Sequence, residues 1–112
     1  MDLKANEIDA STVAVTVAGK VMMGSESEKI ENLVEQLLRE GKRTIIFDLG
    51  GVTTLDSTGI GRFISSFNKI AAVGGQMKMA AATGHVFQTF HVSMLDTVFP
   101  FYPTVEEAAA GN

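Results

Sequence analysis

The sequence predicts an α/β fold in which a mixed β-sheet of four to five strands is flanked by about four helices. Two patterns support this prediction. Val13, Val15 and Val17 alternate with smaller or polar residues, which is typical of a strand with one buried face. A later segment repeats apolar residues at the spacing of an amphipathic helix: Ile30, Leu33, Val34, Leu37 and Leu38. Strand and helix patterns then alternate, and helical crossovers imply parallel neighbouring strands.

The chain begins with a predicted β-hairpin. Residues 3–8 form a weaker strand pattern, and Asp9-Ala10-Ser11 has the composition of a tight turn. The stronger strand follows and is expected to end at Gly19. A hairpin at this position adds an antiparallel pair to the otherwise parallel sheet.

The first helix and the central strand come next. Ser25 and Glu28 have the spacing of a capping box, which predicts the helix start, and Gly41 is a typical residue just after a helix end. The continuous apolar run from Thr44 to Leu49 predicts a strand buried on both faces. A loop is expected at Gly50-Gly51.

The second half of the chain repeats the alternation with shorter elements. We expect, in order, a helix over residues 57–72 that is ended by Gly74-Gly75, a strand around Met77 and Met79, a short helix from about Thr83, a last strand at Val98-Phe99, and a helix capped by Thr104 and Glu107.

Composition excludes several classes of function. The chain has 112 residues, which corresponds to one domain. It has no cysteine and two histidines, so thiol chemistry is excluded and a protein-built transition-metal site is not expected. The net charge of −4 has the wrong sign for binding nucleic acid or an anionic membrane. No secretory signal or long apolar run is present, so we expect a cytoplasmic protein.

The segment from Asp56 to Gly61 carries the functional signal. It joins the end of the central strand to a helix, a position where open α/β sheets usually bind ligands. The hydroxyls of Ser57 and Thr58 stand where free N–H groups and the helix dipole favour an anion such as a phosphate. Simple helix capping is the alternative explanation. Capping alone does not account for Gly59 and Gly61, because each glycine destabilises a helix by about 0.5–1 kcal/mol relative to alanine. Two such residues indicate that backbone or a partner approaches the helix closely here.

This segment resembles a known signature. Asp56-Ser57-Thr58-Gly59-Ile60-Gly61 is similar to the D-S-[ST]-G-[LIV]-G motif of STAS domains, in particular of bacterial anti-sigma factor antagonists. The strand ending in Asp48-Leu49 and the segment from Gly74 to Met79 also fall where that family has counterparts. The resemblance covers about residues 3–109, so we expect a single STAS domain over 1–112.

The resemblance implies a protein-binding switch without catalytic residues, metal or cofactor. In the family, an anti-sigma factor that is a serine kinase phosphorylates the serine after the aspartate, and a PP2C-type serine phosphatase reverses this. By position that serine is Ser57, with Thr58 as the alternative acceptor. The unphosphorylated protein binds the anti-sigma factor and releases a sigma factor. The expected partner-binding residues are Asp56, Ser57, Thr58, Gly59, Ile60, Gly61 and Arg62.

One departure and two alternatives accompany this interpretation. The family's G-E-[LIV]-D appears here as Gly19-Lys20-Val21-Met22, without either acid, which is expected to bear on partner choice. Met22-Met23 is expected in the core or on an adaptable partner surface. The chain could instead be a STAS subunit of another assembly, such as a stress-signalling scaffold or a lipid-transport complex. It could also be a small module that binds an anion or nucleotide.

Overall fold

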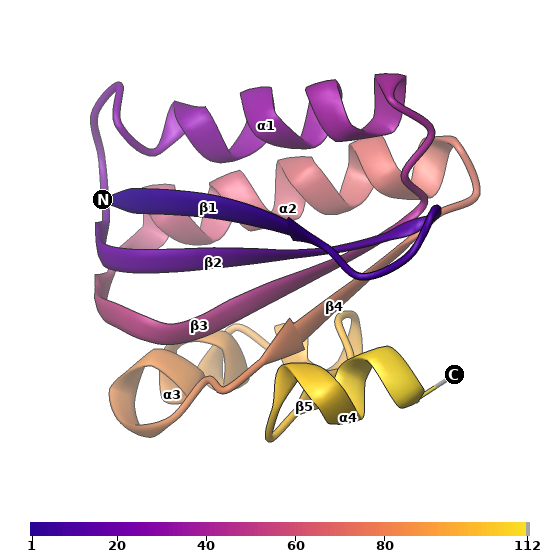
Figure 1. Ribbon diagram of the computed structural model, residues 1–112. Helices are drawn as coiled ribbons and strands as arrows, with labels where there is room; N and C mark the ends of the chain where they lie inside the picture. The colour runs from indigo at the N-terminus through magenta and orange to yellow at the C-terminus, as the bar shows by residue number, and fades with distance from the viewer. Residues whose placement is uncertain (112) are drawn as a thin grey trace.

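Five strands form one mixed sheet in the computed structural model, which describes residues 1–111 (Figure 1). Their order in space is the order in the chain: β1 (Asp2–Glu7), β2 (Thr12–Val21), β3 (Thr44–Leu55), β4 (Gln76–Ala80) and β5 (Phe101–Tyr102). β1 and β2 pair antiparallel, and the remaining pairs are parallel. The predicted hairpin and mixed sheet are therefore confirmed.

Four α-helices flank the sheet: α1 (Glu28–Arg39), α2 (Ser57–Ala72), α3 (Gly84–Val92) and α4 (Val105–Ala110). α1 and α2 lie side by side along the sheet, whereas α3 packs against β3 and α4 packs against β3, β4 and β5 (Figure 1). A short 3-10 helix, η1 (Leu95–Thr97), precedes β5. In the described part of the chain no helix has the length and apolar character needed to cross a membrane.

The main core lies between the sheet and α1, α2 and α3. The alternating valines of β2 are buried in it, as the period-two pattern predicts. The ring of Phe63 from α2 packs edge-on against Phe47 of β3 and Phe90 of α3, at centroid distances of 5.1 and 5.7 Å. Ile46 is buried on the opposite face with Ala80 and Ala108. β3 is thus buried on both faces, as its apolar run indicates.

The expected loop at Gly50-Gly51 is wrong, because β3 continues through both glycines to Leu55. The pairing of β2 with β3 shifts register between Thr16 and Ala18, close to Gly51. A Cβ on Gly51 would lie 3.0 Å from the Cβ of Ala18, so the glycine permits the two strands to approach at this irregularity. The glycines mark an irregularity within the strand rather than its end.

The predicted capping box at Ser25 and Glu28 is also wrong. α1 begins at Glu28 after Ser27, and no side chain caps it by a hydrogen bond. The hydroxyl of Ser27 instead donates to the carbonyl of Gly24 (3.2 Å) and accepts from Nε of Arg62 (3.0 Å). The serine that precedes α1 therefore serves a contact with α2, which a local pattern cannot reveal.

The last strand lies later than expected, at Phe101–Tyr102 rather than Val98-Phe99. The N–H of Met79 donates to the carbonyl of Pro100, and β4 pairs with the two residues that follow this proline. Phe99 is instead buried beside Phe67 and Phe90. The predicted N-cap of the last helix, α4, is confirmed, since the Thr104 hydroxyl accepts a hydrogen bond from the N–H of Glu107.

Candidate functional site

The carboxyl ends of β2 and β3 meet at one edge of the sheet, on the left of Figure 1, where α1 and α2 begin. Two segments leave this edge. One is the start of α2, which carries the predicted site residues. The other is the connection from β2 to α1, Met22–Ser27, which we call the β2–α1 loop. Because β2 and β3 are paired as far as Val21 and Leu55, the two segments start as neighbours.

Asp56 joins these two segments. One carboxylate oxygen, Oδ1, accepts a hydrogen bond from the N–H of Gly59 (2.8 Å) and so caps α2. The other, Oδ2, accepts from the N–H of Met23 in the β2–α1 loop (3.0 Å). The bond from Gly59, followed by that from Met23, lowers the pKa of Asp56 from its usual value of 3.8. Asp56 therefore acts within the chain as a charged acceptor for two backbone segments.

Ser57 is the first residue of α2, and its side chain is exposed. Within residues 1–111, no hydrogen bond involves the Ser57 hydroxyl, so it is free to react or to contact another molecule. Thr58, the alternative acceptor, is half-buried. The α2 helix is 16 residues long, and its positive end lies at Ser57, so an anion there is favoured.

The two glycines of the motif have different surroundings. Gly59 is buried, and a Cβ there would lie 2.1 Å from the carbonyl oxygen of Val21. It allows α2 to start directly against the end of β2. Gly61 is exposed, and a Cβ there would meet nothing within 4 Å. The predicted close approach of backbone is thus found at Gly59, and nothing within the described chain explains Gly61.

Ile60 and Arg62 complete the predicted set, and both are engaged inside the molecule. Ile60 is buried in the main core. The guanidinium of Arg62 contacts Glu31 of α1 (3.3 Å) in addition to its hydrogen bond to Ser27. It also donates to the carbonyl of Gly24 (3.4 Å). Arg62 thus ties the β2–α1 loop and α1 to α2, and a direct contact of Arg62 with a partner stays a prediction.

The exposed part of the site includes residues outside the motif. Met22 and Met23 lie on the surface, and Met23 is 80% exposed. Of the two expectations for this pair, the surface location is therefore the correct one. The hydrogen bond from the backbone N–H of Met23 to Asp56 brings this segment of the chain next to the start of α2. Sequence spacing does not indicate this contact, because 33 residues separate its two partners.

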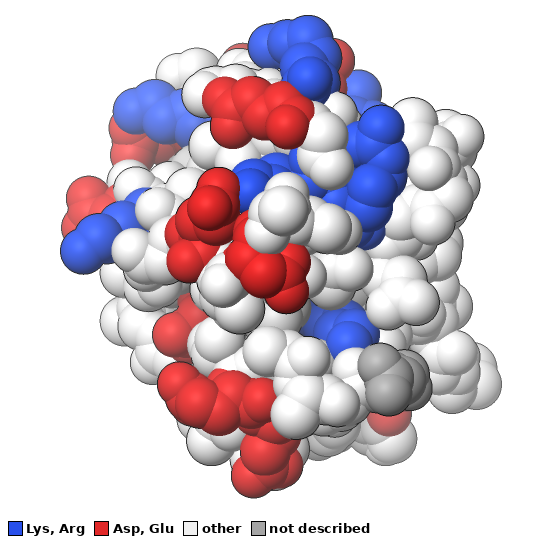
Figure 2. All heavy atoms as spheres, turned by 45° about the vertical axis from the view of Figure 1, so that its right-hand side comes forward, with Lys and Arg blue, Asp and Glu red and all other residues white. Residues whose placement is uncertain are grey.

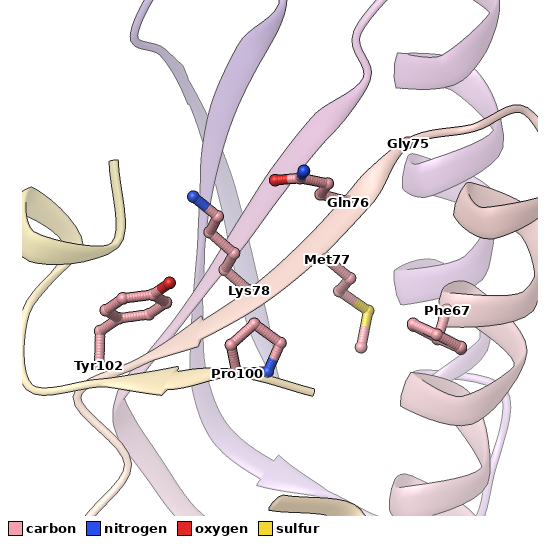
Figure 3. A pocket seen from close by; sticks show the side chains of 7 residues that line it. All are labelled: Phe67, Gly75, Gln76, Met77, Lys78, Pro100 and Tyr102. Carbon is pink, nitrogen blue, oxygen red and sulfur yellow. The ribbon is translucent and has the colours of Figure 1, made fainter. Parts of the chain in front are cut away.

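Three surface hollows lie elsewhere, and none is lined by a residue from Asp56 to Gly61. One of about 280 Å³ follows the edge of β4 between Phe67 and Tyr102 (Figure 3). Lys78 on its wall is buried, and its ammonium donates to the carbonyl of Ala108 (2.9 Å) and to that of Gly111. This lysine thus anchors α4.

Among the described residues, neither the charged side chains on the face in Figure 2 nor the metal-ligating side chains form a second candidate site. Acidic and basic side chains are interspersed on the face that Figure 2 shows. Over residues 1–111, no group of three or more His, Asp or Glu side chains could hold a metal ion. His85 and His91 lie on α3. Nε2 of His85 is 2.8 Å from the carbonyl oxygen of Thr53, and Nδ1 of His91 is 2.8 Å from Asp96.

The stabilising effect of Asp56 is expected to disappear in acid. Because its pKa is lowered in the folded protein, its contribution is complete above the unfolded-state pKa and is lost as the pH falls through the folded-state pKa. The difference in unfolding free energy between the wild type and Asp56→Asn should therefore shrink as the pH drops below 3.8. Urea unfolding of both proteins at a series of pH values measures this difference in unfolding free energy. An equal difference at neutral and strongly acid pH would contradict the prediction.

The sequence of this chain matches a known protein family. The family model described as "STAS domain" matches residues 4–108. The anti-sigma-B factor antagonist of Bacillus subtilis is 29% identical over 98 residues, which are 88% of this chain and 85% of that protein.

Solved structures share the fold. An anti-sigma factor antagonist from Mycobacterium paratuberculosis superposes with a TM-score of 0.84 at 23% identity, covering 97% of this chain and 91% of that one. The Bacillus cell fate determinant SpoIIAA in its phosphorylated form gives a TM-score of 0.77 at 20% identity, covering 97% of each chain. The predicted mixed α/β architecture is thus the architecture of these neighbours.

Proposed function

We propose that this chain, which belongs to the STAS domain family, is an anti-sigma factor antagonist that is switched off by phosphorylation of Ser57. In its unphosphorylated form it binds an anti-sigma factor and thereby frees a sigma factor. The anti-sigma factor is a serine kinase, and a PP2C-type phosphatase restores the binding form. An anti-sigma factor antagonist among its relatives supports the class of partner.

One observation carries the assignment of Ser57. It is the exposed hydroxyl at the positive end of α2, and it lies on a surface with exposed apolar neighbours, Met22 and Met23. Thr58 is less accessible, since it is half-buried. A kinase therefore reaches Ser57 more easily than Thr58. SpoIIAA, a neighbour in fold, is described in a phosphorylated form, which agrees with a switch of this kind.

The physical effect of the phosphate is on binding rather than on folding. Phosphorylation replaces a neutral hydroxyl by about −1.5 to −2 charge units. The dipole of α2 tolerates this charge locally, so the fold should survive. A partner packed over Ser57, however, would bury the phosphate beside the carboxylate of Asp56. Removing an unpaired charge from water costs several kcal/mol, and about 1.4 kcal/mol changes affinity tenfold.

The chemistry is a phosphoryl transfer for which this chain supplies only the acceptor. The Ser57 hydroxyl oxygen forms a bond to the γ-phosphorus of ATP, ADP leaves, and the hydroxyl proton passes to a base of the kinase. The described residues include no base hydrogen bonded to Ser57, so the partner must provide it.

The direct test is phosphorylation followed by site mapping. We expect the cognate anti-sigma factor kinase, incubated with Mg-ATP, to place a single phosphate on the wild type and on Thr58→Val. Ser57→Ala should take none. Intact-mass measurement and peptide mapping give the stoichiometry and the site. Stoichiometric phosphate on Ser57→Ala would overturn the assignment of Ser57.

A further inference from the structure

We propose that Asp56 is a positioning residue that couples the state of Ser57 to the β2–α1 loop, so that one modification changes two parts of the binding surface. This inference rests on the proposed function. It assigns to Asp56 a role inside the chain, in place of the direct partner contact that the sequence predicts. Through this coupling, a phosphate on Ser57 would change the position of the Met22 and Met23 side chains relative to a binding partner.

The geometry gives Asp56 two separate contacts. Its Oδ1 holds the first turn of α2 through Gly59, and its Oδ2 holds the β2–α1 loop through Met23. Ser57 is covalently next to this carboxylate. The same carboxylate therefore connects the residue next to Ser57 with the β2–α1 loop.

The loop depends on a small number of contacts. Arg62 holds its distal part through Gly24 and Ser27, and the N-terminal amine of Met1 contacts it through Glu26. At its proximal end, the Met23 N–H donates to Asp56, and the side chains of Met22 and Met23 are exposed. Apolar side chains in this position are an adaptable contact surface for an apolar patch of a partner. Asp56 thus determines where the most exposed apolar group of the site lies.

A phosphate on Ser57 should weaken one of the two contacts selectively. The phosphate and the Asp56 carboxylate are both negatively charged at neutral pH and repel each other, and the amide hydrogen bonds to Asp56 lower its pKa and so favour its charged form. The bond to Gly59 is short and partly buried, whereas the bond to Met23 is longer and exposed. The helix cap should therefore persist while the bond to the loop is lost.

Amide hydrogen exchange measured by NMR tests this coupling in the full-length protein. On phosphorylation, we expect the Met23 amide to exchange roughly tenfold faster, the factor typical of losing one hydrogen bond to a charged group, and the Gly59 amide to stay protected. Asp56→Asn keeps a capping oxygen but offers a single acceptor atom. It should show fast exchange at Met23 before phosphorylation and no further change after it.

Matched variants distinguish coupling through Asp56 from a general increase in the mobility of the protein. Asp56→Ser preserves a capping hydroxyl and should behave like Asp56→Asn. Asp48→Asn alters a carboxylate that accepts from the N–H of Gly50 in β3, and it should leave the response at Met23 unchanged. For the unphosphorylated protein, we also expect Asp56→Asn to bind the anti-sigma factor several-fold more weakly although Ser57 is intact.

The failures of the two proposals are distinguishable. A wild-type protein that takes phosphate at Ser57 but shows the same Met23 exchange as before would overturn the coupling and leave the proposed function standing. The coupling is also overturned if Asp56→Asn responds to phosphorylation as the wild type does. Absence of phosphate at Ser57 with the cognate kinase would instead overturn the proposed function itself.

Discussion

Ser57→Asp is expected to bind the anti-sigma factor at least about 100-fold more weakly than the wild type, because a desolvated unpaired charge costs several kcal/mol. Ser57→Ala should keep its binding to the anti-sigma factor, because alanine places no charge in a surface that the partner covers. Neither change should lower the melting temperature appreciably, because Ser57 is exposed and an acid at the start of α2 is favoured by the helix dipole. Titration calorimetry with the purified anti-sigma factor measures both affinities.

The control for this prediction adds the same charge elsewhere. Ser93 is an exposed serine just after α3, and its hydroxyl donates to the carbonyl of Thr89. Ser93→Asp should therefore leave binding unchanged. If it weakens binding as much as Ser57→Asp does, net charge rather than the position of Ser57 controls the interaction, and the proposed site is wrong.

Gly59→Ala is expected to destabilise the fold by about 2 kcal/mol, because its Cβ must displace the backbone of β2 and such overpacking typically costs about 1–3 kcal/mol. The atom in the way is the carbonyl oxygen of Val21, 2.1 Å from the new Cβ, and a backbone atom cannot rotate aside. For a domain of this size the loss corresponds to a fall in melting temperature of roughly 10 °C. Thermal and urea unfolding measure it.

Gly61→Ala is the matched control two residues along the same helix. Nothing within 4 Å meets its new Cβ, so replacing this exposed glycine should stabilise the protein by about 0.5–1 kcal/mol. Equal destabilisation by the two substitutions would show that the contact with Val21 is not the cause. If Gly61→Ala raises stability but weakens partner binding, the glycine is retained for the partner and not for the fold.

The elements that the sequence predicts correctly share a local cause. The valines of β2, the apolar stripe of α1 and the capping threonine of α4 each act within a few residues of the chain. The same holds for the start of α2, since Asp56 and Gly59 are three residues apart. Hydrophobic periodicity and capping preferences are sufficient wherever the pattern that specifies an element lies within that element, even when its apolar face packs against other elements.

The errors occur where a residue contacts a distant segment. Gly51 continues β3 because Ala18 of β2 lies against it. Ser27 precedes α1 with its hydroxyl used by Arg62 of α2. β5 starts after Pro100 because that is where β4 finds a backbone partner. In each case the deciding contact is with another element of the fold, and no local pattern encodes it.

By itself, the sequence determined the mixed α/β architecture and the location of the segment from Asp56 to Gly61 at a helix start, and its resemblance to STAS domains led to the acceptor role that we propose for Ser57. Only the tertiary structure decided that Asp56 also holds Met23, that Arg62 is engaged inside the chain, and that Gly59 and Gly61 meet different requirements. The physical reason is that propensity and capping act along one segment. Hydrogen bonds and close packing between β2, the β2–α1 loop and α2 exist only once the sheet has brought those segments together.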